Sequence, residues 1–105
     1  MDQFDTVKMA SGGLALILES SSTWDDFAAH AEKWKRRLNA KSLSKMVITF
    51  DECLAEVAVA DGEFWITYDD FQGSIQLEPK SPRYNGIVAQ LQAELRHGSD
   101  DAKSS

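Results

Sequence analysis

The middle third of the chain alternates apolar and polar residues with a period of two. This is typical of strands that keep one face on a core and the other toward water. Residues 45–78 carry the alternation, and Asp61-Gly62 at their centre is a sequence favoured in two-residue hairpin turns. That turn pairs Val57 with Ile66. We therefore predict a four-stranded antiparallel meander over this segment.

Two further turns extend the pairing on either side. A turn at Glu52-Cys53 places Phe50 on the apolar face, and a turn at Asp70-Phe71 places Ile66 opposite Ile75. All three registers put the apolar residues on the same face, and a slip of one residue would break that agreement. The meander is thus predicted to bury one face completely.

Apolar residues recur at helical spacing in two segments outside the meander. The first segment, about 24–38, follows Thr23, a suitable N-cap, and has basic residues in its last turns. The second, 82–97, begins at Ser81-Pro82, and Gly98 is expected to end it. We predict a helix over each.

Phe4–Met9 and Leu14–Leu18 add one or two N-terminal strands to the prediction, with a turn between them. The expected fold class is α+β: a two-layer sandwich in which an antiparallel sheet carries both helices on one face. Residues 1–98 are expected to form a single globular domain. The polar segment 99–105 is expected to be a disordered C-terminal tail.

Composition and net charge indicate the expected cellular compartment and exclude some classes of partner. The chain has 105 residues and one cysteine, so an internal disulfide is impossible and we expect a cytoplasmic protein. The longest clean apolar run, Leu14–Leu18, is far too short to cross a bilayer, and no membrane association is expected. The net charge of −6 makes nucleic acid an unlikely partner.

Charge is strongly segregated along the chain. The stretch Lys33–Lys45 holds six basic residues and no acid, whereas Met46–Pro79 holds eight acids and no base. Separated charges of opposite sign steer binding partners and set specificity. The basic cluster lies at a helix C-terminus, where cations are favourable, so we interpret it as a solvated face; anion binding there stays open.

The acidic residues share the outer face of the predicted meander with one tryptophan. An apolar centre within a polar, charged rim is typical of a protein-binding patch, and tryptophan is over-represented among binding hot spots. An ordinary wet sheet face is the alternative. The predicted partner-binding residues are Trp65, Glu56, Glu63, Glu78 and Val47.

These features favour a non-catalytic protein-binding module, such as an inhibitor, immunity-type or accessory protein, with a basic protein partner. No catalytic residue, metal ligand or cofactor is predicted. A self-associating homodimer is the first alternative, and a small acidic secretion chaperone is another. A metal-dependent enzyme is a further one, because the meander brings four carboxylates to one end of the sheet, Asp51, Glu52, Asp69 and Asp70.

Overall fold

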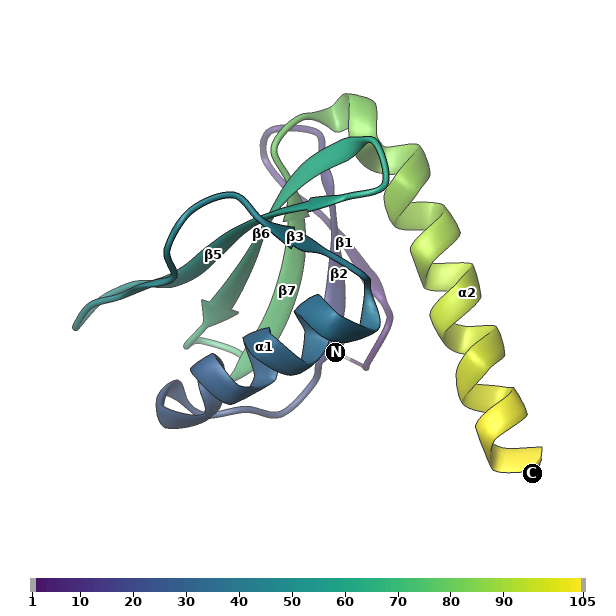
Figure 1. Cartoon of the computed structure of the whole chain (residues 1–105), viewed down its shortest axis with the longest axis horizontal. Helices are drawn as coiled ribbons and strands as arrows, with labels where there is room; N and C mark the ends of the chain where they lie inside the picture. The colour runs from purple at the N-terminus through teal and green to yellow at the C-terminus, as the bar shows by residue number, and fades with distance from the viewer. Residues whose placement is uncertain (1, 105) are drawn as a thin grey trace.

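The computed structural model describes the backbone of residues 2–104 and the side chains of residues 2–98. Within this part of the chain the fold is α+β, as predicted: seven strands form one open antiparallel sheet, and two helices contact it (Figure 1). The strands are β1 (Thr6–Lys8), β2 (Leu14–Glu19), β3 (Lys41–Ser42), β4 (Val47–Ile48), β5 (Cys53–Val59), β6 (Gly62–Asp69) and β7 (Ser74–Pro79). Their order in the sheet is β1-β2-β7-β6-β5-β3, and β4 also pairs with β5.

Both predicted helices are present. A single 3-10 turn at Trp24–Asp26 leads into α1 (Phe27–Arg37), and a second at Pro82–Tyr84 leads into α2 (Asn85–Ser104). The side chain of Thr23 accepts a hydrogen bond from the backbone N–H of Asp26, and Ser81 caps the second helix in the same way. The sequence signals for both helix starts are therefore confirmed.

The predicted end of the second helix is wrong. α2 continues through Gly98 to Ser104, because a glycine on an exposed helix surface weakens a helix without necessarily ending it. The predicted disordered tail, 99–105, falls on residues whose side chains lie outside the described part of the chain. That prediction stays open.

The alternation predicted for the meander is confirmed in β5, where every second residue from Cys53 to Val59 is buried. The predicted registers are wrong by two residues: Val57 lies opposite Phe64, and Ile66 lies opposite Leu77. A shift of two leaves every side chain on its predicted face, because the side-chain period of a strand is also two.

The reason for the shift is the position of the turns. The β5–β6 hairpin turns at Ala60-Asp61, where Ala60 has φ 53°, and Gly62 is already part of β6. Gly62 is needed for space instead: a Cβ there would lie 2.8 Å from Ile87 Cδ1 of α2. The β6–β7 loop is also longer than predicted, since Asp69 pairs with Ser74.

The predicted first strand of the meander is replaced by two short strands, β3 and β4, on the same edge of β5. Beyond β4 the chain turns at once, with Thr49 N–H donating to the Glu52 carbonyl at 2.8 Å. Phe50 therefore lies at the tip of a hairpin and is 95% exposed. Its predicted place on the apolar face is wrong.

The core fills the space between the sheet and the two helices. α1 contributes the fully buried Phe27, Ala31 and Trp34, and α2 contributes Val88. The buried indole N–H of Trp34 donates to the Glu19 carboxylate of β2 at 2.7 Å. β1 and β2 extend the sheet beside β7. The N-terminal strands are thus members of the sheet.

Candidate functional site

The opposite face of the sheet carries the residues predicted to bind a partner. At its centre Glu56, Trp65 and Glu78 lie directly opposite one another across β5, β6 and β7. The Trp65 side chain is half-buried, and its strand has a hydrogen-bonded neighbour on each side. The indole is therefore presented by the middle of the sheet, on the face away from the helices.

A lysine that the sequence analysis did not include completes this row. Lys80 Nζ donates to the Glu56 carboxylate and, at 3.3 Å, to Glu63 Oε1. It also lies 5.5 Å from the centroid of the Trp65 ring, within the range of a cation–π contact. We call Glu56, Glu63, Trp65, Glu78 and Lys80 the Trp65 face.

Lys80 was not among the predicted partner-binding residues, because it lies one residue beyond the run 46–79 that contains no base. The spacing of residues in the sequence nevertheless indicated that Lys80 belongs to this face. Lys80 is two residues after Glu78, so the period of the strand puts both side chains on one face. Its hydrogen bond lowers the pKa of Glu56, and Glu56 in turn raises the pKa of Lys80. The pair stays fully charged at neutral pH.

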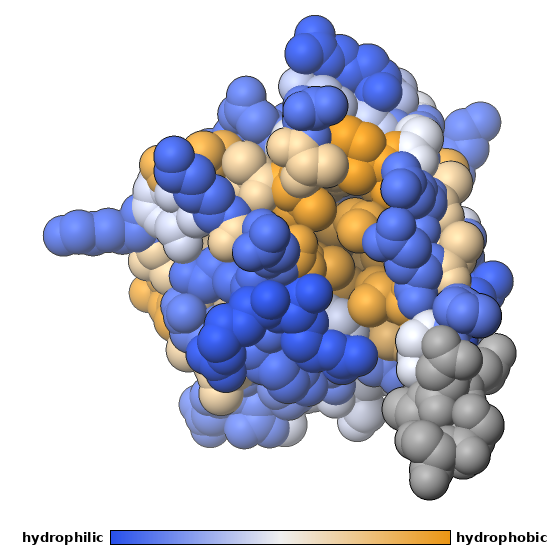
Figure 2. All heavy atoms as spheres, turned by 45° about the vertical axis from the view of Figure 1, so that its right-hand side comes forward, coloured by the Kyte–Doolittle hydropathy of each residue, from blue (hydrophilic) through white to orange (hydrophobic). Residues whose placement is uncertain are grey.

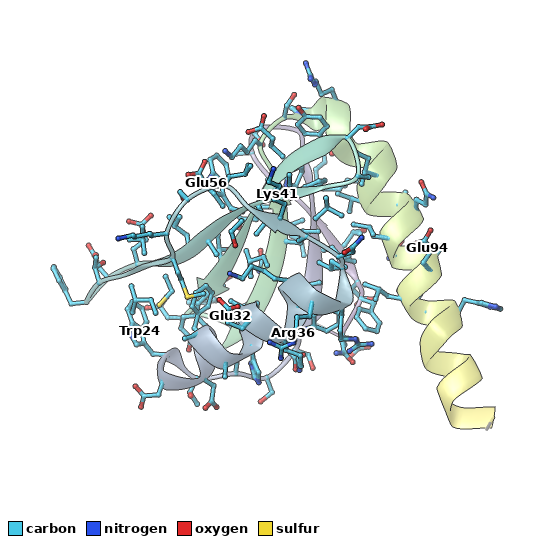
Figure 3. All side chains as sticks on the ribbon, in the orientation of Figure 1. Trp24, Glu32, Arg36, Lys41, Glu56 and Glu94 are labelled. Atoms are coloured by element: carbon cyan, nitrogen blue, oxygen red, sulfur yellow. The ribbon has the colours of Figure 1, made fainter. Side chains whose placement is uncertain are left out.

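The net charge of this face is smaller than the sequence run suggests. By register, Asp69 belongs to it as a fourth carboxylate, and Lys41 of β3, opposite Ala58, belongs to it as a second base. Ser44 Oγ also donates to Glu56 Oε1 at 2.8 Å. Figure 3 labels both Lys41 and Glu56. The outer face is thus acidic overall but contains its own cations.

Glu78 differs from the other carboxylates of the Trp65 face. Burial raises its pKa, a hydrogen bond from Thr67 Oγ1 at 3.1 Å opposes that rise, and the nearby charge of Asp69 adds to it. Glu78 consequently takes up a proton at higher pH than Glu56 does. Glu78 therefore gives this face a carboxylate that is held by a hydrogen bond between β6 and β7.

Val47, the remaining predicted residue, lies on the same side of the sheet but toward its end. It pairs with Leu54 and is 39% exposed. Its partner Leu54 lies on β5 two residues before Glu56, the partner of Trp65. Val47 is therefore displaced from the Trp65 row by two residues along β5. Val47 extends the apolar part of the face toward the β4–β5 hairpin.

Other candidate sites received less support from the geometry. Among the side chains that the structure describes, no three His, Cys, Asp or Glu residues are grouped so that they could hold a metal ion. In the basic cluster, Lys33 pairs with Glu19 and Lys35 with Glu32. Arg37 lies over the Trp34 ring at 4.4 Å. Several of these cations are therefore engaged within the molecule.

A groove opens between the end of α1 and α2, and the sequence analysis did not predict it. Its volume is ≈ 270 Å³, and Figure 2 shows apolar surface at its base with polar side chains around it. Glu94 projects from α2 at its side (Figure 3). The groove is lined by Leu38, Asn39, Val59, Ala60, Ile87, Gln90, Leu91 and Glu94.

Comparison with known proteins gives no family for this chain: no protein-family model, no curated protein and no solved structure matches it. In the described part of the chain, none of the helices combines the length and the apolar character needed to span a bilayer.

Proposed function

We propose that this protein is a non-catalytic binding module that contacts a basic protein partner through the Trp65 face. The observation that carries the proposal is the row Glu56–Trp65–Glu78, which sets a half-buried indole between two carboxylates on three neighbouring strands. Aromatic residues held by a rigid element and ringed by polar groups are typical anchors of protein interfaces. Inhibitors, immunity-type proteins and accessory proteins act in this way. We propose a cytoplasmic setting.

In this proposal Trp65 supplies most of the contact energy, and the carboxylates orient the partner. Glu63 is the most accessible of them, with 54% of its side chain exposed. Glu56 is held by Lys80, so a lysine or arginine of the partner has to compete with that ammonium group. Val47 adds apolar area beside the row. Lys80 therefore moderates the affinity for cationic partners.

The test is a titration of the purified partner against matched variants. Trp65→Ala is expected to weaken binding by about 30-fold or more, the effect of losing about 2 kcal/mol at a hot spot. Glu63→Gln is expected to weaken it by less. Glu32→Gln on α1 is the matched control, since its side chain is 52% exposed and is also paired with a lysine.

Lys80→Met tests independently whether the negative charge of the Trp65 face favours a basic partner. It keeps the alkyl stem near Trp65 but frees Glu56 and Glu63, so affinity for a basic partner is expected to rise. Unchanged affinity in Trp65→Ala, or equal losses in Glu63→Gln and Glu32→Gln, would count against the Trp65 face. Loss of a concentration-dependent dimer in Trp65→Ala would point to self-association instead.

A further inference from the structure

Among the side chains of residues 2–98, the large apolar ones that are most exposed belong to two places in the chain. Four of them fall between residues 43 and 50, and the fifth is in the β6–β7 loop. Scattered exposed apolar residues are normal, but a gathering of them marks an interaction site. With their exposed fractions, they are Leu43 42%, Val47 39%, Ile48 48%, Phe50 95% and Phe71 92%.

Two phenylalanines are the extreme members of this set. Phe50 lies in the turn of the β4–β5 hairpin, which projects beyond the rest of the sheet (Figure 1). Phe71 lies in the loop that follows β6. Because β5 and β6 are antiparallel neighbours, the start of β5 and the end of β6 share one end of the sheet. The two turns that carry these rings therefore lie at the same end of the sheet.

Hydrogen bonds fix the backbone that presents each ring. In the hairpin, Thr49 N–H donates to the Glu52 carbonyl at 2.8 Å, and Thr49 Oγ1 donates to Asp51 Oδ1 at 2.9 Å. In the loop, Phe71 N–H donates to Asp69 Oδ1 at 3.0 Å. Loops that are already ordered lose less entropy on binding than flexible ones. The two rings are thus presented by preformed turns.

The charged residues in the two turns that carry the rings are acidic. The two turns contain Asp51, Glu52, Asp69 and Asp70. The loop after β6 is also tied to the segment before α1, since Ser22 N–H donates to the Gly73 carbonyl at 2.6 Å and the Trp24 ring meets Tyr68 edge-on at 5.8 Å. These two contacts bring the 3-10 turn before α1, with its two further acids, to the same end of the sheet. They are Asp25 and Asp26.

We propose that these two turns, which we call the Phe50–Phe71 tip, dock a basic protein surface. The partner would offer apolar recesses for the two rings, with lysine and arginine side chains around them. Charge complementarity favours this occupant over two others. Anionic lipid headgroups would be repelled by the carboxylates. A second copy of this chain would bring like charges together across a two-fold contact.

The tip goes beyond the Trp65 face and does not depend on it. Trp65 and Phe50 lie in different elements, and the Val47–Leu54 pair of the β4–β5 hairpin lies between them on the outer face. The experiment therefore has to separate the two surfaces.

The test uses a defined probe, a fluorescein-labelled peptide of alternating lysine and leucine, and a second peptide in which glutamate replaces every lysine. Fluorescence anisotropy is expected to show at least about tenfold tighter binding of the lysine peptide. The double variant Phe50→Ser/Phe71→Ser is expected to lose at least about tenfold in affinity for it. Both rings are more than nine-tenths exposed, so the variant should fold, and its melting curve checks this.

Further variants locate the binding. Glu32→Gln on α1, outside both surfaces, is expected to leave the peptide affinity unchanged. A loss in Trp65→Ala with none in the double phenylalanine variant would place the peptide on the Trp65 face and overturn the tip alone. Asp51→Asn/Asp70→Asn is expected to weaken binding and to reduce its dependence on salt. The proposal is overturned by equal affinity for the two peptides or by no loss in the double phenylalanine variant. Phe50-dependent binding to lipid vesicles, or a dimer that the double variant abolishes, would overturn it too.

Discussion

Glu19 is the residue whose replacement tests the packing of the core most directly. Its carboxylate accepts hydrogen bonds from Lys33 Nζ at 2.8 Å and from the fully buried Trp34 indole at 2.7 Å. Replacing Glu19 by Ala removes both contacts at once. The indole N–H then has no acceptor in the interior between α1 and the sheet.

The magnitude follows from the two lost contacts. Leaving a buried donor without a partner costs about 1–3 kcal/mol. The ion pair adds at most about 1 kcal/mol, because 40% of the Lys33 side chain is exposed and water screens it. Glu19→Ala is therefore expected to lower the free energy of unfolding by about 1–4 kcal/mol. Glu19→Gln keeps an acceptor for Trp34 and is expected to cost about 1 kcal/mol or less.

Urea denaturation followed by circular dichroism measures these differences, and a double-mutant cycle isolates the hydrogen bond. In a Trp34→Phe background there is no N–H to satisfy, so Glu19→Ala is expected to cost no more than about 1 kcal/mol. The same loss in both backgrounds would refute the reasoning. A loss below about 0.5 kcal/mol in the wild-type background would refute it as well.

The pH dependence of the Glu19→Gln difference gives a second check. Burial opposes the charge of Glu19, but the hydrogen bonds from Lys33 and Trp34 and the charge of Lys33 outweigh it, so its pKa is lowered from 4.5. The resulting stabilisation is present above pH 4.5 and is lost as the pH falls through the lower value of the folded state. The wild type should therefore exceed Glu19→Gln in stability at pH 7 and lose that advantage in acid.

Two other substitutions test the sheet. Gly62→Ala is expected to destabilise the fold by about 1–3 kcal/mol, because its Cβ would lie 2.8 Å from Ile87 Cδ1 and 3.0 Å from Tyr84 Cδ1; thermal melting measures this, and an unchanged Tm would contradict it. Glu78→Gln is expected to stabilise the protein at pH 7, because burial raises the pKa of Glu78 and disfavours its charged form. This gain should shrink as the pH falls toward 4.5, where the wild-type carboxyl is protonated; a gain that grows in acid would contradict the assignment.

Local chemistry made much of the fold predictable. Thr23 and Ser81 satisfy backbone N–H groups that any helix start leaves free, so they marked the starts of the two helices that the apolar spacing predicted. Alternation likewise assigned Trp65 to the outer face, whatever the exact register. What failed depended on contacts between distant segments. Gly62 looked like a turn residue, but it lies in β6, where a Cβ would come within 3.0 Å of Ile87, Phe64 and Tyr84.

In the candidate sites, too, local patterns were predicted correctly and contacts between distant segments were not. Glu56 and Glu63 were identified from their strands, whereas their partner Lys80 was missed because charge was counted along the chain and not across the sheet. Phe50 was assigned to the apolar face by the register of a turn predicted at Glu52-Cys53. The tight turn at Thr49 carries it out of the sheet, and no periodicity in the sequence reports that turn.

Interrupted edges have a consequence for how this molecule meets others. β1 has three residues, and on the opposite side β3 and β4 have two each. Neither border offers a long row of free main-chain amides that a foreign strand could extend. Unlimited stacking into fibrils is thereby discouraged, and recognition is left to side chains, which can be changed one at a time without altering the scaffold beneath them.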